Sequence, residues 1–127
     1  MAVDDRLTRA LAGHRTFDVT TTGRRTGNRR RIEIWYFVVD DDLYITGTPG
    51  RRDWIANLHA DERLTVHITH GAPVDFDGRG EVITDVDERR AIMERIREIE
   101  PWYAEQGHAV EEWVGSSPLV RVTIDAV

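Results

Sequence analysis

The chain has 127 residues, a net charge of −6 from 23 acidic and 17 basic side chains, and neither cysteine nor lysine. Without cysteine it has no thiol nucleophile, thiolate metal site, iron–sulfur cluster or disulfide, and without lysine it has no Schiff-base chemistry and no lysine-dependent phosphate loop. The length fits one domain over residues 1–127, and the acidic balance disfavours nucleic acid as a partner.

The amino terminus predicts a short helix and no targeting signal. Residues 4–13 place Leu7 and Leu11 four apart on one helix face, and Gly13 is a typical helix stop. The first residues lack the basic-then-apolar build of a signal peptide. Because no run of 18 apolar residues occurs in the chain, we expect a cytoplasmic protein with no membrane span.

Three strands are predicted next. Residues 15–22 alternate apolar and polar side chains, which indicates a strand. Residues 31–39 are apolar on both faces beyond Glu33, so we expect a central strand that is covered on both sides. An aspartate turn at 40–42 leads into a strand at 43–46, and the two strands form a hairpin.

The middle of the chain predicts a short helix and two further strands. The helix follows Gly50, and its apolar face consists of Trp54, Ile55 and Leu58. Residues 63–69 alternate as a half-buried strand does. Residues 74–84 form a longer strand in which Gly78 and Gly80 indicate a bulge or a barrel corner.

The last third predicts two helices and a closing strand. Asp85 opens the main helix and forms a capping box with Glu88. The apolar stripe of this helix is Ile92, Ile96 and Ile99. Pro101 ends or kinks it, a second helical segment runs to Gly115, and residues 119–124 form a β-branched strand. Most connections are too short for crossovers, so we expect an α+β fold with a mainly antiparallel six-stranded barrel and flanking helices.

An arginine cluster lies on the turn between the first two strands. Its members are Arg24, Arg25, Arg29, Arg30 and Arg31, with Gly23 and Gly27 between the strands. Guanidinium groups bind phosphate or carboxylate oxygens in pairs, and glycines let backbone N–H groups approach an anion. The pattern therefore indicates a phosphate-binding hairpin. A solvated turn paired with surface carboxylates explains the same composition.

A second segment that favours anions precedes the short helix. It contains Thr48, Gly50, Arg51 and Arg52 beside a helix start, where free N–H groups attract anions. A plain turn with Asp53 in the first helical turn is the simpler interpretation. Because two such segments occur, we expect Thr48, Gly50 and Arg51 to line the same pocket as the arginine hairpin.

The remaining candidates carry weaker signals. We expect no metal site, because the chain lacks cysteine and has no HExxH pattern. Three aromatic residues flank the helix kink, and they form either the roof of a flat ligand or part of the core: Trp102, Tyr103 and Trp113.

Two motifs together resemble the deazaflavin-dependent nitroreductase family. The first runs from Thr20 to Gly27 and continues to Arg30, and the second comprises Thr48-Pro49-Gly50 followed by Trp54 and Asn57-Leu58. The resemblance covers about residues 14–124. In this family the segment between Gly50 and Trp54 is usually several residues longer.

The resemblance implies a split β-barrel related to pyridoxamine-phosphate oxidases, and an oxidoreductase that uses coenzyme F-420. Reduced F-420 is a deazaflavin with a phosphate and a polyglutamate tail, and it would pass a hydride to a quinone, a nitroaromatic or another electron-poor small molecule. The resemblance places Thr48 and Tyr103 at catalytic positions near the ring and the acceptor. It assigns cofactor binding to Arg24, Arg25, Thr26, Gly27, Arg30, Thr48, Gly50, Arg51, Trp54 and Asn57. It also implies a homodimer.

Two other functions are compatible with the same hairpin. Related split barrels bind FMN, FAD or haem, so a flavin or haem protein is one alternative. A module that binds an anionic ligand without catalysis is the other. Titration with F-420, FMN, FAD and haem separates these functions.

Overall fold

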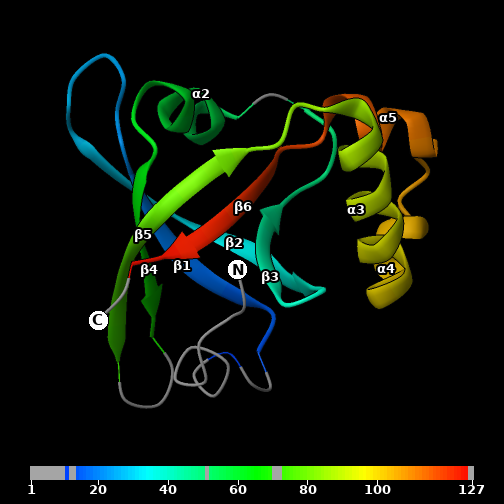
Figure 1. The fold of residues 1–127 in the computed structure, drawn as a ribbon, viewed down its shortest axis with the longest axis horizontal. Coiled ribbons are helices and arrows are strands. Elements are labelled where there is room, and N and C mark those ends of the chain that lie inside the picture. Colours follow the sequence, from blue (N-terminus) through cyan, green and yellow to red (C-terminus); the bar gives the residue numbers. More distant parts are fainter. Residues whose placement is uncertain (1–10, 12–13, 51, 70–72, 126–127) are drawn as a thin grey trace.

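A computed structural model describes residues 11, 14–50, 52–69 and 73–125 of the protein. The chain folds as a closed barrel of six antiparallel strands in the order β1-β2-β3-β6-β5-β4 (Figure 1). The strands are β1 Thr16–Thr22, β2 Arg29–Val39, β3 Asp42–Thr46, β4 Arg63–Ile68, β5 Val74–Val82 and β6 Leu119–Ile124. The helices are α2 Asp53–Ala60, α3 Val86–Ile99, α4 Pro101–Ala104 and α5 Val110–Ser116. The expected α+β fold is confirmed. The expected helix at 4–13 lies outside the described residues, apart from the buried Leu11.

The barrel interior is one of two hydrophobic cores. Alternate residues of each strand point into it, such as Phe17 and Val19 of β1 and Leu64 and Val66 of β4, all of which are buried. Helix α2 closes one end of the barrel beside the β1–β2 hairpin (Figure 1). Because Leu58 of α2 joins this core, the helix is held in a fixed position over the barrel end.

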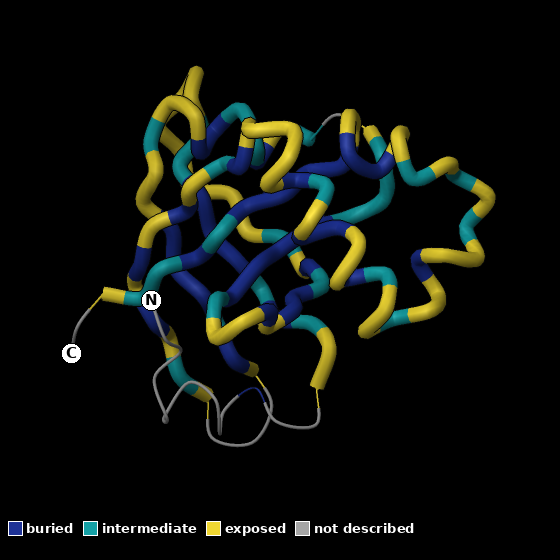
Figure 2. The backbone as a smooth tube through the Cα atoms, turned by 45° about the vertical axis from the view of Figure 1, so that its right-hand side comes forward, coloured by how far each residue is buried: buried dark blue, intermediate teal, exposed yellow. Residues whose placement is uncertain are grey.

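The second core lies between the outer face of β2 and β3 and the helices α3, α4 and α5, which gather on one side of the barrel (Figures 1 and 2). Phe37 and Val39 point outward from β2 into this core, so β2 is covered on both sides as expected. Trp113 of α5 is completely buried here. One expectation for α3 is wrong: Ile99, the last residue of the helix, does not continue the buried apolar stripe but is 48% exposed.

Gly78 and Gly80 do not interrupt β5. The strand pairs with β6 in unbroken register through both glycines, and with β4 through Gly78 as far as Arg79. Of the two expected features, a bulge or a barrel corner, the bulge is therefore wrong. A Cβ atom at Gly78 would collide with the backbone oxygen of Thr123, and one at Gly80 would lie 2.9 Å from Leu64 Cδ2. The glycines are there because neighbouring chain atoms approach closely at these positions.

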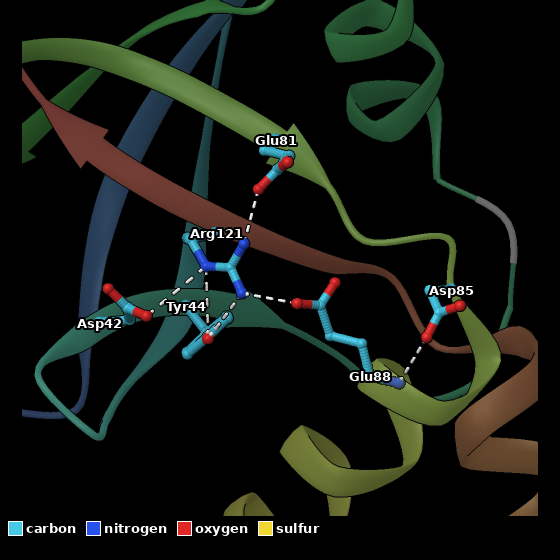
Figure 3. Close-up of polar contacts among 6 residues, drawn as sticks. All are labelled: Asp42, Tyr44, Glu81, Asp85, Glu88 and Arg121. Atoms are coloured by element: carbon cyan, nitrogen blue, oxygen red, sulfur yellow. Dashed lines mark hydrogen bonds and ion pairs between the residues drawn. The ribbon is translucent and has the colours of Figure 1, made fainter. Parts of the chain in front are cut away.

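The start of α3 is fixed to the barrel by Arg121 of β6 (Figure 3). Asp85 caps the helix by accepting a hydrogen bond from the Glu88 backbone N–H at 2.9 Å. The Glu88 carboxylate does not return to the cap, as a full capping box requires. It accepts instead from Arg121, whose guanidinium also donates to Glu81 at 2.6 Å and to Tyr44. Strand β5, strand β6 and helix α3 are thereby tied together.

No helix in the described ranges is both long enough and apolar enough to cross a membrane.

Candidate functional site

The arginine hairpin is a rigid turn. Gly23 donates its backbone N–H to Asn28 O at 2.7 Å, and Gly27 donates to Gly23 O at 2.9 Å. Gly27 has φ +73°, a left-handed conformation that glycine adopts without strain. The Thr26 hydroxyl accepts from the Asn28 backbone N–H at 3.1 Å. Gly27 and Thr26 therefore shape the turn, and these hydrogen bonds hold the backbone from which the arginine side chains extend.

Asn57 joins this hairpin to helix α2. Its side-chain oxygen accepts both the backbone N–H of Arg24 at 3.1 Å and the guanidinium of Arg24 at 3.2 Å. The amide nitrogen lies 3.5 Å from the Thr21 hydroxyl. Asn57 is 4% exposed, so this buried amide is a fixed anchor. The anchor explains why a helix face that is otherwise apolar carries an asparagine.

Besides Arg24, which Asn57 binds, the four other arginines of the cluster divide into two groups. Arg29 donates to Thr65 at 3.1 Å and Arg31 to Asp18 at 2.8 Å, so both are held on the outer wall of the barrel. In contrast, Arg25 and Arg30 are exposed and make no hydrogen bond or ion pair with any residue that the structure describes. These two guanidinium groups keep their donors for a ligand.

The loop before α2 is organised by Arg52. Its guanidinium donates to the backbone oxygen of Thr48 at 3.1 Å and lies 3.3 Å from the Thr48 hydroxyl. Gly50 has φ +142° and donates its backbone N–H to Ser116 O at 3.0 Å. The loop is thus held from both sides, by α2 and by the end of α5. Arg51 lies outside the described residues.

Two adjoining pockets meet at the first turn of α2. The arginine pocket, about 640 Å³, is lined by Gly23, Arg24, Arg25, Thr26, Arg30, Arg31, Ile32, Asp53, Trp54 and Asn57. The aromatic pocket, about 410 Å³, is lined by Ile32, Glu33, Ile34, Trp35, Thr46, Gly47, Thr48, Arg52, Trp54, Trp102 and Tyr103. Because Ile32 and Trp54 line both, the two pockets adjoin each other, and together they are called the groove, with a cationic end and an aromatic end.

The aromatic end has flat walls. Trp35 of β2 stacks on Trp102 of α4 with centroids 5.7 Å apart and 14° between the ring planes. Tyr103 meets both rings edge-on, at 5.8 Å from Trp35 and 5.2 Å from Trp102. Trp102 is 41% exposed, whereas Tyr103 is 1% exposed. Trp102 thus lines the pocket, as the ligand-roof interpretation expects, and Trp113 belongs to the core, whereas Tyr103 lines the pocket and is also part of the core.

Burial and the charge of Glu100 raise the pKa of Tyr103 well above the ordinary value of 10.0. The hydroxyl therefore stays protonated at neutral pH, and it makes no hydrogen bond with a described residue. A phenol in this state is a hydrogen-bond donor for a ligand in the pocket.

The structure brings most of the expected site residues together. Arg24, Arg25, Thr26, Arg30, Trp54 and Asn57 line or shape the arginine pocket, and Thr48 and Tyr103 share the aromatic pocket. Gly50 lines neither of these pockets but a third one, with Arg24 and Arg52. Trp35 and Ile32 were not predicted as site residues, although the alternation of side chains on β2 marks Trp35 as facing away from the barrel interior.

A family model matches residues 2–124 of the chain, and its description is F-420H(2)-dependent quinone reductase. The chain belongs to this family. As a member of the F-420H(2)-dependent quinone reductases, the protein is an oxidoreductase enzyme and coenzyme F-420 is its cofactor. The expected deazaflavin family is thereby confirmed. A search of curated proteins finds no match.

Solved structures share the fold of this quinone reductase family member at low identity. A FAD-binding protein from Mesorhizobium loti has a TM-score of 0.70 and 19% identity, over 98% of this chain and 91% of that chain. A putative pyridoxamine 5'-phosphate oxidase from Listeria innocua has a TM-score of 0.69 and 13% identity, over 96% and 93%. A putative 5-nitroimidazole antibiotic resistance protein from Bacteroides thetaiotaomicron has a TM-score of 0.67 and 15% identity, over 99% and 83%. At these identities the likeness shows the fold alone.

The groove fits the cofactor of the quinone reductase family. A deazaflavin ring is flat and needs apolar walls, which Trp54, Trp35 and Trp102 supply in the aromatic pocket. A phosphate needs donors with no other partner, which Arg25 and Arg30 supply in the arginine pocket. No described His, Asp or Glu side chains cluster in a way that holds a metal ion.

Proposed function

We propose that the protein binds reduced coenzyme F-420 along the groove and reduces an electron-poor acceptor, either a quinone or a nitroaromatic compound. The observation that carries the proposal is that the arginine pocket and the aromatic pocket adjoin each other. One end offers two unpartnered guanidinium groups, and the other end offers stacked indoles with two hydroxyl groups. Such a groove matches a ligand with a phosphate at one end and an aromatic ring at the other.

The arginine pocket holds the phosphate in this proposal. Arg25 and Arg30 donate charged hydrogen bonds to it, while Arg24 is oriented by Asn57. The Gly23–Asn28 turn keeps these groups in place before the ligand arrives. Since the turn is already ordered, little conformational entropy is lost on binding.

The aromatic pocket orients the ring and the acceptor. When bound, the reduced coenzyme supplies a hydride, and the acceptor takes up that hydride together with one proton from solvent. Tyr103 and Thr48 donate hydrogen bonds to the ring or to the acceptor oxygen that gains negative charge. Arg52 fixes the position of Thr48 through the backbone oxygen and the hydroxyl. Trp35 and Trp102 exclude water and hold the acceptor parallel to the ring.

Turnover with an acceptor panel tests this function. The purified protein is mixed with reduced coenzyme F-420 and either a quinone, a nitroaromatic or no acceptor, and the return of the oxidised coenzyme's absorbance is followed. Turnover with the quinone or the nitroaromatic, above the rate without acceptor, is the expected result. Binding of the coenzyme without turnover would favour a binding module.

A flavin is the second candidate cofactor, because a structural neighbour is described as FAD-binding. FMN and FAD carry the same pairing of a flat ring with a phosphate, so the groove suits them chemically. Titrations of the apoprotein with F-420, FMN, FAD and haem separate the candidates. We propose that F-420 binds most tightly.

We further propose that residues 1–127 form one domain that works in the cytoplasm as a homodimer. Val38, Ile99 and Trp102 are exposed apolar side chains that a contact between two copies would bury. Light scattering on the eluting protein measures the mass directly, and a monomer mass would overturn the dimer. A single cooperative unfolding transition is the result expected for one domain.

A further inference from the structure

A third pocket lies on the other side of the α2 amino terminus. This serine pocket, about 960 Å³, is lined by the start of α2, the end of β5, the last residues of α5 and the link to β6, including Gly115, Ser116 and Ser117. It adjoins the proposed cofactor groove, because Arg24 and Asp53 also line the arginine pocket and Arg52 also lines the aromatic pocket. All three pockets meet at the first turn of α2.

The charge around the serine pocket favours an anion. Arg24, Arg52 and Arg89 line it, and Asp53 is the acidic residue among its lining residues. The Asp53 side chain is 95% exposed and lies 3.8 Å from Arg24, so it neutralises little of this charge. The described lining residues of the pocket therefore carry more positive than negative charge.

Arg89 contributes a buried positive charge to this pocket. It is 9% exposed, and its guanidinium donates to the backbone oxygens of Ile83 at 2.7 Å, Val114 at 2.5 Å and Ser117 at 2.5 Å. All three acceptors are neutral, and Arg89 has no ion pair with any described residue. A buried cation without a carboxylate partner leaves a positive potential in its surroundings, and buried charges are normally paired.

Two kinds of polar group without a described hydrogen-bond partner belong to residues of the same pocket, the first-turn N–H groups of α2 and the Ser117 hydroxyl. Helix α2 begins at Asp53 with no side-chain cap, so the backbone N–H groups of its first turn lack a capping acceptor. Ser117 is 3% exposed, and its buried hydroxyl has no hydrogen-bond partner among the described residues. An uncapped helix start, a residue with an unpartnered buried hydroxyl and a residue with a buried guanidinium thus all belong to the wall of one pocket.

We propose that the serine pocket binds the carboxylates of the acidic tail of coenzyme F-420. The inference rests on the proposed function, which places the coenzyme phosphate in the arginine pocket. From there Arg24 leads directly into the serine pocket, since its side chain lines both. A flexible chain of carboxylates therefore passes around the α2 amino terminus and meets Arg52, Arg89 and the helix N–H groups in turn.

Gly115 offers a test that leaves the known contacts in place. A Cβ atom at Gly115 would have no other atom within 4 Å, so a longer side chain fits at the pocket rim. Gly115 lies within α5, where both glutamate and glutamine favour the helix more than glycine does. Gly115→Glu therefore adds one negative charge to the serine pocket, and Gly115→Gln is the matched uncharged control.

The experiment measures the affinity of both variants for two forms of the coenzyme, F-420 with its glutamates and the form that keeps the phosphate but lacks the glutamates. We expect Gly115→Glu to bind the complete coenzyme about tenfold more weakly than Gly115→Gln, because the added carboxylate repels those of the tail. The difference shrinks in high salt. Both variants bind the glutamate-free form alike.

Other outcomes separate the inference from the proposed function. Equal affinity of the two variants for complete F-420 overturns the serine pocket as the tail site. Equal weakening of both coenzyme forms by Gly115→Glu also overturns it, because the pocket would then hold the phosphate or the ring. If the wild-type protein binds neither form, the proposed function itself fails. Melting temperatures of the variants show whether each is folded.

Discussion

Arg25 and Arg30 give the sharpest test of the arginine pocket, because nothing described in the fold depends on their guanidinium groups. Replacing either by glutamine removes a charged donor and no described internal contact. A hydrogen bond to a charged group contributes about 1.5–3 kcal/mol. Both side chains are exposed, so screening keeps the loss near the lower end. Since about 1.4 kcal/mol corresponds to a factor of ten, each variant should bind F-420 about tenfold more weakly.

The assay is a fluorescence titration of F-420 at low and at high salt. The matched control is Arg95→Gln, because Arg95 is an exposed arginine on α3 that pairs with Asp40 at 3.1 Å and lines neither pocket of the groove. Arg95→Gln should bind the coenzyme as the wild type does, and all three variants should keep the wild-type melting temperature. Unchanged affinity for F-420 in both Arg25→Gln and Arg30→Gln would show that the cluster is a solvated turn and not a phosphate site.

Four further predictions follow from the structure. Tyr103→Phe should lower kcat while the melting temperature stays within a few degrees, because the ring provides the packing and the hydroxyl makes no described hydrogen bond; an unchanged kcat would remove the residue from the mechanism. Arg121→Met should destabilise the fold by about 2 kcal/mol, between an exposed and a buried ion pair, and an unchanged denaturant midpoint would contradict the clamp on α3. Gly78→Ala should cost about 1–3 kcal/mol by overpacking against the β6 backbone, and a melting curve like that of the wild type would show that β6 can move. Burial raises the pKa values of Tyr36, Tyr44 and Tyr103 above 10.0 in the folded state. The free energy of unfolding should therefore be at its full value below pH 10 and should fall as the pH rises through the folded-state pKa values, because the folded protein resists deprotonation. A free energy of unfolding that stays constant above pH 10 would refute this.

The sequence predicted the barrel because its strands have strong local signals. Residues 63–68 alternate strictly, and residues 31–39 are apolar on both faces, which matches a β2 strand between two cores. Residues 119–124 are found as the last strand with the expected bounds. Such signals depend on neighbours along the chain and can be read from the sequence.

Features that depend on distant neighbours were not predictable in the same way. The glycines of β5 indicated a bulge or a barrel corner, but they stand where β6 and side chains of the barrel interior approach closely. Glu88 was expected to complete a capping box, but Arg121, 33 residues later, attracts its carboxylate.

In the candidate site, too, local features were predictable from the sequence and features that depend on distant neighbours were not. The arginine turn and the Thr48 loop carry recognisable motifs, and these motifs led to the family. The separation of Arg25 and Arg30 from their paired neighbours was not visible, since it depends on Asp18 and Thr65 across the barrel wall. The serine pocket was equally hidden, because it joins α2 to the end of α5 through the fold alone.

A crystal structure with bound coenzyme F-420 tests the central claim most directly. The account predicts the deazaflavin ring in the aromatic pocket between Trp54 and Trp102, and the phosphate within hydrogen-bond distance of Arg25 or Arg30. A ring that lies outside the aromatic pocket, or a phosphate that contacts neither arginine, would contradict it.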